Sequence, residues 1–140
     1  MIDLIKVARE NRRLDDIIEQ VPYAKLIGMQ AIYIGDELLF KLPALDSNIG
    51  NQTLPAIHGG CIGGFMELAA GFHVLSLIEC ERIPKVVDFS LDYLRPGRFK
   101  TTYCRCQVVR QGRKVVNVSI AAWQTQEQQP IANARTHLLL

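Results

Sequence analysis

The sequence contains no long stretch of apolar residues and no concentration of charge of one sign. No apolar run approaches the roughly 18 residues that a membrane-spanning helix requires. The formal net charge of the 140 residues is only +2, and the lysines and arginines are scattered along the chain. Nucleic-acid-binding proteins favour a basic face. We therefore expect neither a membrane nor a nucleic acid as a partner.

The N-terminus lacks the features of an export signal, because charged residues interrupt the first 20 residues throughout. Without such a signal, we expect the four cysteines to be reduced thiols of a cytoplasmic protein. Cys104 and Cys106 form a C-x-C pair, which would lie on one face of a strand. Because no second pair of ligands has zinc spacing, we interpret them as small core residues and expect no metal site.

The apolar residues that are present suffice for one core. They make up 49% of the 140 residues, which predicts a single globular domain over residues 1–140. Between residues 2 and 21 they recur mostly at three- and four-residue spacing, which predicts an amphipathic helix that Pro22 ends. We expect this helix to precede a core of residues 22–140.

The rest of the chain shows strand patterns around one helix pattern. Residues 29–43 predict two strands that meet at Gly35-Asp36, and residues 44–56 predict a loop. A buried helix is expected from Gly60 to about Glu79. Alternating apolar and polar residues then predict four more strands at 87–93, 101–110, 113–124 and 131–139. The order predicts an α+β fold in which an antiparallel sheet packs on one central helix.

The segment IHGGCIGGFMELAAGF, residues 57–72, combines five glycines with one carboxylate, Glu67. Each glycine inside a helix costs about 1 kcal/mol relative to alanine, and a buried carboxylate costs more unless it is paired. On a helix the glycines and alanines share the face of Glu67, whereas the bulky residues lie opposite. We interpret the glycines as a trough for a second backbone or a ligand. Close helix packing with a structurally paired Glu67 is the alternative.

His58, Gly59 and Gly60 stand at the start of this helix. Free N–H groups and the positive end of the helix dipole make a helix N-terminus a site for an anion or an oxyanion. A carboxylate base and such an N–H site are what acyl transfer needs. A purely structural role for His58 stays open at this point.

The motif HGG, followed by a helical carboxylate nine residues after the histidine, resembles the acyl-CoA thioesterases of the hotdog fold, specifically the phenylacetate-pathway (PaaI-like) type. The segments VDFSLDYLRPG and VVRQGRKVV resemble strand motifs of that family, and the likeness covers residues 22–140. It implies an antiparallel sheet wrapped around a long central helix and hydrolysis of an acyl-CoA. It also implies no cofactor, because coenzyme A is part of the substrate. The active sites would lie between the subunits of a homodimer, often paired into a homotetramer.

The resemblance also implies roles for individual residues. Glu67 would be the general base or nucleophile, the Gly60 N–H would form the oxyanion hole with Gly59 nearby, and His58 would contact the thioester carbonyl region. Asn51 matches the family's asparagine only loosely, because NQTLPAIH is one residue longer than the commonest spacing. Gln52 is therefore the alternative for that role.

Further residues are expected at the substrate. Val86, with Val87 beside it, stands where relatives often carry a hydroxyl residue that orients the attacking water, so the sequence leaves open whether hydrolysis is impaired. Arg95, Arg113 and Lys114 belong to a group of basic residues at the ends of the expected strands. They are either solvated or, as we expect, in contact with the phosphates of coenzyme A.

Helix geometry favours a site made by two chains. Gly60 and Glu67 lie two turns apart, or ~10 Å at ~1.5 Å per residue, so one thioester carbon cannot approach both within one helix. The helix of a second, antiparallel chain would bring its Glu67 to Gly60. Two other functions stay open, an acyl-thioester hydratase or dehydratase and a non-catalytic acyl-CoA-binding protein. The walls of the acyl pocket are expected from residues 46–57 and from Phe65, Met66 and Leu68.

Overall fold

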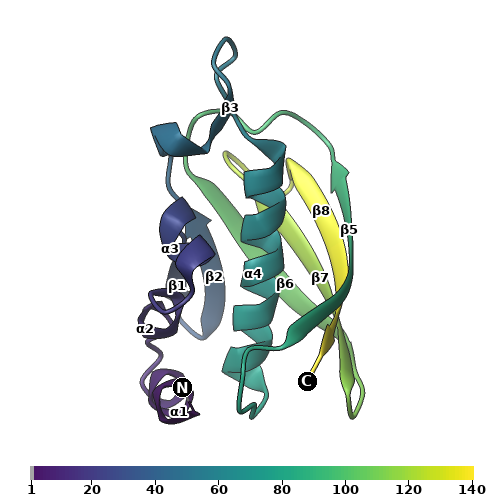
Figure 1. Ribbon diagram of the computed structural model, residues 1–140. Coiled ribbons are helices and arrows are strands. Elements are labelled where there is room, and N and C mark those ends of the chain that lie inside the picture. The colour runs from purple at the N-terminus through teal and green to yellow at the C-terminus, as the bar shows by residue number, and fades with distance from the viewer. Residues whose placement is uncertain (1) are drawn as a thin grey trace.

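The structure, a computed structural model, describes residues 2–140 and the side chains of residues 3–140. One long helix, α4 (Gly59–Leu77), lies along a six-stranded antiparallel sheet that wraps around it (Figure 1). In sheet order the strands are β1 (Gln30–Ile34), β2 (Glu37–Leu42), β6 (Thr102–Gln111), β7 (Val115–Trp123), β8 (Ala132–Leu139) and β5 (Lys85–Tyr93). The predicted α+β hotdog fold is thereby confirmed.

The N-terminal region differs from the prediction of one helix over residues 2–21. Three short helices occur instead, α1 (Ile2–Glu10), α2 (Asp15–Ile18) and α3 (Pro22–Ile27). The chain turns between α1 and α2 at Arg12, whose φ of 55° lies in the left-handed region. Pro22 begins α3 rather than ending a helix, because its fixed φ suits the first helical turn. α3 then ends at Gly28, which has a φ of 78°.

These N-terminal helices belong to the same hydrophobic core as α4. Their buried side chains are those of Ile5, Ala8, Leu14, Ile17, Ile18, Ala24 and Ile27. Arg9 reaches the end of α4, where its guanidinium donates hydrogen bonds to the carbonyl oxygens of Leu75 (3.2 Å) and Ile78 (2.8 Å). A cation at this end of a helix also complements the helix dipole. The segment before residue 22 is therefore attached to the core through its buried apolar side chains and to the end of α4 through Arg9.

The strand predictions are confirmed with small changes of bounds. β1 and β2 form a hairpin whose two-residue turn is Gly35-Asp36, and the φ of Gly35 is 62°, as such turns favour. The turn between β6 and β7 is 112–114, slightly later than predicted. On β7 the apolar residues of the alternating pattern are all buried: Val116, Val118, Ile120 and Ala122.

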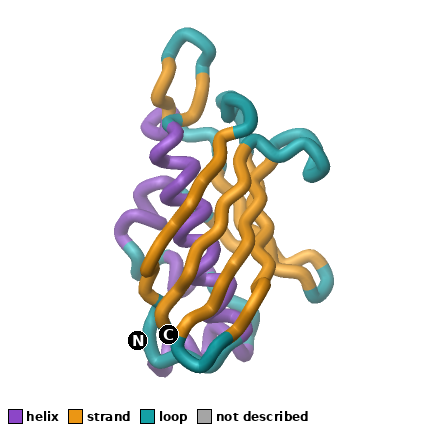
Figure 2. The backbone as a smooth tube through the Cα atoms, turned by 90° about the vertical axis from the view of Figure 1, so that its right-hand side faces the viewer, coloured by secondary structure: helices purple, strands orange, loops and turns teal. Residues whose placement is uncertain are grey.

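The segment 44–56, predicted to be a loop, has regular structure of its own. It contains a 3-10 helix (Asp46–Asn48) and a small hairpin of β3 (Ile49–Asn51) and β4 (Ala56–Ile57). The hairpin projects beyond the sheet next to the start of α4 (Figure 2). The same view shows that no helix covers the outer face of the sheet.

Helix α4 fills the core with the side chains opposite Glu67. Phe65, Met66 and Phe72 have no exposed surface. By length and composition the 19 residues of α4 are apolar enough to cross a membrane, which corrects the sequence-based statement that no apolar stretch approaches that length. The reason is that Glu67 is the only acidic or basic residue in the helix apart from His73. Most of α4 is buried inside the protein, as is ordinary for a core helix.

Candidate functional site

His58 caps the start of α4. Its backbone is extended, with φ −59° and ψ 129°, and its Nδ1 accepts a hydrogen bond of 2.9 Å from the N–H of Gly60. The proton of the neutral imidazole is then on Nε2. The His58 carbonyl accepts bonds from the N–H groups of Cys61 (2.9 Å) and Ile62 (3.1 Å). Of the first four N–H groups of the helix, only that of Gly59 has no partner within residues 2–140.

Tyr93, at the end of β5, holds the first turn of α4 from the side of the sheet. Its hydroxyl donates a hydrogen bond of 2.6 Å to the carbonyl oxygen of Gly59. A Cβ on Gly59 would lie only 3.1 Å from that hydroxyl oxygen, so glycine permits the close approach. Sequence analysis did not single out Tyr93, and its only signal was an aromatic residue beside the RPG turn.

Tyr23, on α3, flanks the same helix from the other side. A Cβ on Gly64 would lie 2.6 Å from the Tyr23 Cε1 atom, and a Cβ on Gly63 would lie 3.2 Å from Leu91 Cδ2 on β5. The group nearest Gly64 is therefore a ring of the same chain, rather than the second backbone or ligand expected there. Burial, with the nearby Cys61 second, raises the pKa of the Tyr23 hydroxyl, which therefore stays protonated at neutral pH.

Gly64→Leu is expected to lower the free energy of unfolding by about 1–3 kcal/mol, because the new side chain overpacks against the Tyr23 ring. The gain in helix propensity, at most about 1 kcal/mol, is smaller. Urea denaturation measures the difference, with Gly71→Ala as the control, because a Cβ there meets Ile83 at an ordinary 3.5 Å. Adding Tyr23→Ala should recover part of the loss. A Gly64→Leu variant more stable than the wild type would contradict the crowding at this position.

Glu67 lies on the stripe of α4 that contains Gly60 and Gly64, between α3 and β5. Its side chain is half-buried and makes no hydrogen bond or ion pair with the residues that the structure describes. It is also not among the buried polar groups that lack a partner, so its carboxylate reaches solvent. The alternative of a structurally paired carboxylate therefore finds no partner within the described chain.

A pocket of about 370 Å³ opens beside the start of α4. Its lining comes from three segments: Tyr23, Leu26 and Ile27 of α3; Ser47 and Asn48; and His58, Gly60 and Cys61. Asn48 is buried, its Nδ2 donates a hydrogen bond of 3.0 Å to the Ile27 carbonyl, and its own carbonyl accepts one of 2.8 Å from the His58 N–H. Asn48 is thus the side-chain amide at this pocket. It belongs to the segment 46–57 that was expected to line the acyl pocket, but the sequence pattern did not single it out.

Asn51 and Gln52, the two candidates for the asparagine role, are both exposed and lie at the tip of the β3–β4 hairpin. The Asn51 Oδ1 accepts hydrogen bonds from the N–H groups of Thr53 (2.9 Å) and Leu54 (3.1 Å). This is a local turn in which the side chain stabilises its own backbone. Within one chain neither residue lines the pocket beside His58.

The two valines predicted at the substrate lie far from the start of α4 in the same chain. Val86 is half-buried and Val87 is 61% exposed, next to an irregularity in the pairing of β5 with β8. They begin β5, whereas Tyr93 ends it at the first turn of α4. Seven residues of strand span roughly 23 Å. One chain therefore does not bring the valines and His58 together.

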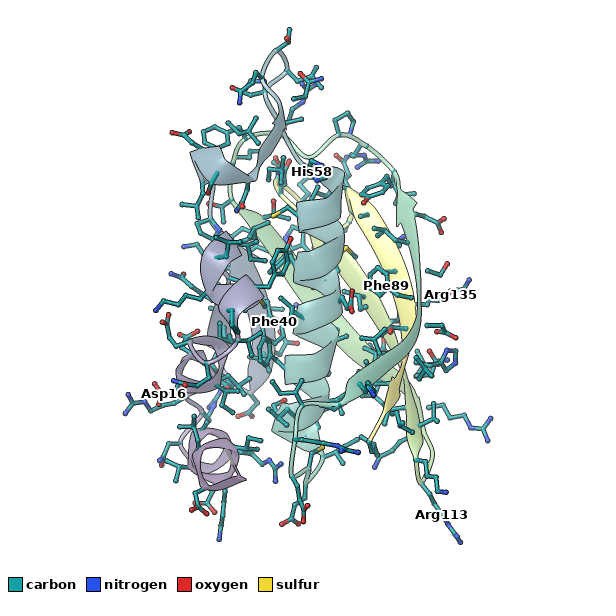
Figure 3. The ribbon with its side chains drawn as sticks, in the orientation of Figure 1. Asp16, Phe40, His58, Phe89, Arg113 and Arg135 are labelled. Carbon is teal, nitrogen blue, oxygen red and sulfur yellow. The ribbon has the colours of Figure 1, made fainter. Side chains whose placement is uncertain are left out.

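The predicted basic residues are divided between the two ends of the molecule. Arg113 and Lys114 lie in the turn between β6 and β7, at the opposite end from His58 (Figure 3). They line a pocket of about 500 Å³ together with Arg110 and His137. Arg95 instead follows β5, at the end where α4 begins, and its side chain is exposed.

Cys61 is not activated as a nucleophile by its position at the start of α4. Burial raises the pKa of its thiol to about 11, so the thiol is protonated at neutral pH. All four cysteines are free, and Cys104 and Cys106 are buried side by side in β6 as expected. Within residues 2–140 no group of three or more His, Cys, Asp or Glu side chains could hold a metal ion.

Two of the residues expected to line an acyl pocket are core residues instead. Phe65 and Met66 have no exposed surface, because they face the sheet. Leu68 is half-buried but lines neither the pocket at His58 nor the one at Arg113. Of the expected segment 46–57, only Ser47 and Asn48 contribute to the pocket at His58.

Comparison with known proteins identifies the family. Residues 54–131 match the profile of the thioesterase superfamily. The chain is 28% identical to the medium/long-chain acyl-CoA thioesterase YigI of Escherichia coli (strain K12), over 84% of each chain. Its structure is similar to that of a Chromobacterium violaceum protein, with a TM-score of 0.81, 42% identity and coverage of 97% of this chain and 95% of that one.

A phenylacetic acid degradation-related protein of Ralstonia eutropha JMP134 has a TM-score of 0.76 over 91% of this chain and 98% of its own. Its identity of 20% shows a common fold only. The match to the family profile, in contrast, covers more than half of the sequence and includes the whole of α4. The chain belongs to the thioesterase superfamily.

Proposed function

We propose that this protein hydrolyses an acyl-CoA to a free acid and coenzyme A, with Glu67 as the general base or nucleophile. The observation that carries the proposal is the half-buried Glu67 carboxylate, which has no partner within residues 2–140 and shares a helix face with Gly60. Membership of the thioesterase superfamily supports hydrolysis of a thioester. The acyl-CoA activity named for the Escherichia coli relative supports coenzyme A as the carrier.

In this proposal each active site lies between two chains. An antiparallel pair of α4 helices that sets Glu67 of one chain opposite Gly60 of the other also sets Gly63 opposite Gly64. Because the Tyr23 ring of the same chain lies against Gly64, the partner helix would approach beside this ring rather than in direct contact with Gly64. β5 is an edge strand of the sheet, and its free backbone groups are suited to pair with a second copy (Figure 1). Together these features support a homodimer, and the uncovered sheet face supports pairing of dimers into a homotetramer.

The thioester carbonyl would bind at the start of α4. We assign the oxyanion to the Gly60 N–H. In the structure this N–H donates its hydrogen bond to the His58 imidazole. The carbonyl oxygen would replace the imidazole as the acceptor. The free Gly59 N–H is the second candidate donor, and it needs no such exchange.

The reaction follows from these positions. As a general base, Glu67 takes a proton from water while the water oxygen attacks the thioester carbon, and the carbonyl electron pair moves onto the oxyanion. The N–H donors stabilise this charge. The C–S bond then breaks, the thiolate of coenzyme A takes up the proton, and the acid is released. As a nucleophile, Glu67 would instead attack the thioester carbon and expel coenzyme A as the thiolate, which takes a proton from water. The resulting mixed anhydride is then hydrolysed to the free acid and the Glu67 carboxylate.

The activity is tested by incubating the purified protein with a panel of acyl-CoAs and measuring the free thiol released. Acetyl-, octanoyl-, palmitoyl- and phenylacetyl-CoA cover the short, medium, long and aromatic classes. The motif of His58, Gly59, Gly60 and Glu67 supports the proposal that the chain is of the phenylacetate-pathway type. Hydrolysis of phenylacetyl-CoA tests whether its substrate belongs to that pathway. Binding without thiol release would favour a non-catalytic acyl-CoA-binding protein, and loss of the double bond of crotonyl-CoA would favour a hydratase. We also propose a cytoplasmic location, for which the four free thiols are the support.

Arg113→Ala combined with Lys114→Ala is expected to raise KM for the acyl-CoA by roughly tenfold and to leave kcat nearly unchanged, as loss of uniform binding does. The reason is that a guanidinium and an ammonium in the 500 Å³ pocket are placed to bind phosphate. Steady-state kinetics measure both constants. The matched control is the acyl-pantetheine, which lacks the nucleotide and should give the same KM with either protein. An unchanged KM for the acyl-CoA would show that these side chains are only solvated.

A further inference from the structure

We propose that the acyl chain of the substrate lies in the pocket between α3 and the start of α4, where Tyr23 and Leu26 limit its length. The identity of the ligand rests on the proposed function. The location rests on the pocket itself, which contains about 370 Å³ and falls within the range of small-molecule sites.

The pocket has a polar end and an apolar end. His58, Gly60 and Asn48 form the polar end, where the helix N-terminus favours the thioester carbonyl. The Nδ2 of Asn48 donates a hydrogen bond to the Ile27 carbonyl, which fixes this side chain at the wall of the pocket. The apolar end is the surface of α3. A thioester whose carbonyl binds at the polar end would therefore direct its hydrocarbon chain toward α3.

The apolar end consists of a floor and a rim. Ile27, the floor, is 2% exposed and belongs to the core. Leu26 and Tyr23, the rim, are 68% and 42% exposed, which leaves two large apolar side chains of the pocket largely uncovered. The Tyr23 ring, which lines the pocket, also contacts Gly64 on the Glu67 stripe. An alkyl chain between these side chains would cover both and remove its own surface from water.

Calorimetric titration of the Glu67→Gln variant with saturated acyl-CoAs, from butyryl to palmitoyl, tests the location without turnover. Each buried methylene is expected to tighten binding by about fourfold, the equivalent of about 0.8 kcal/mol, until the pocket is full. In Leu26→Trp the gain in affinity per methylene should stop at a shorter acyl chain than in the parent protein. In Tyr23→Ala the gain in affinity per methylene should continue to a longer acyl chain. Val109→Trp is the control, because Val109 is 61% exposed on β6 and lines none of the pockets at His58 or Arg113.

The outcomes separate this proposal from the proposed function. If Leu26→Trp and Val109→Trp show the same dependence on chain length as the parent protein, the pocket assignment is overturned, whether or not the wild type is active. If Leu26→Trp shifts the limit but the wild type releases no thiol, the pocket is supported and the hydrolase proposal fails. Should Leu26→Trp not fold, Leu26→Lys provides the second variant, which should weaken binding of long chains by tenfold or more and leave butyryl-CoA unaffected.

Discussion

Glu67→Gln is expected to reduce acyl-CoA turnover by ~10²-fold or more, as is typical when a general base or nucleophile is lost. Glutamine keeps the volume of the side chain but cannot accept the proton of the attacking water. The half-buried carboxylate has no partner within residues 2–140, so the change breaks no contact that the described chain provides. Steady-state release of free thiol measures the effect.

The Glu67→Gln variant also separates catalysis from binding. Its affinity for acyl-CoA, measured by calorimetry, should stay close to that of the wild type, and its melting temperature should not fall. Glu79→Gln is the matched control, because Glu79 is an exposed carboxylate just beyond the end of α4. Near-normal turnover of Glu67→Gln would remove Glu67 from the chemistry and leave only a packing explanation for the glycines around it.

Gly60→Pro is expected to reduce kcat by about 10²–10³-fold if the Gly60 N–H stabilises the oxyanion, the loss observed when one such donor is removed. Proline removes the N–H and is tolerated in the first turn of a helix. A Cβ at this position meets only the His58 side chain among the groups outside the helix backbone, with the nearest atoms at 3.0 Å. Circular dichroism and thermal melting would confirm that α4 still forms.

Gly59→Pro is the matched comparison, because it removes the one free N–H of the same turn. The extended backbone of His58, with ψ of 129°, accepts a following proline. Because a Cβ on residue 59 meets the Tyr93 hydroxyl at 3.1 Å, Gly59→Ala is measured beside it as the variant that adds the same contact and keeps the N–H. A large loss of kcat in Gly60→Pro with a small one in Gly59→Pro assigns the oxyanion to Gly60. The reverse pattern would transfer this role to Gly59, and normal kcat in both would place the oxyanion elsewhere.

The two inactive variants together test whether the site is shared. In a dimer of one Glu67→Gln chain and one Gly60→Pro chain, one site has both residues intact and the other has neither. Refolding an equal mixture should therefore recover about a quarter of the wild-type activity by random pairing into two-fold dimers. Recovery no greater than the sum of the separate variants would indicate that each chain forms its own site.

The sequence by itself determined the elements of the core. Alternation along β7 identified Val116, Val118, Ile120 and Ala122 as buried, and helical spacing identified the bulky face of α4. Such periods report burial directly, since one face of each element meets the core. The same signal failed to divide the N-terminal helices, because Leu14, Ile17 and Ile18 remain buried after the chain turns at Arg12. A change of direction that keeps the same residues inside leaves little trace in the spacing.

The surroundings of the candidate site depended on tertiary structure. The sequence pointed to His58, Gly60 and Glu67 as a motif, but not to the bond between His58 and Gly60 that occupies the proposed oxyanion donor. Asn48 and Tyr23 were missed because their roles come from contacts with residues remote in sequence, the Ile27 carbonyl for one and Gly64 for the other. Periodicity records which side of an element is buried, whereas the identity of the neighbour on that side is set by how the elements pack.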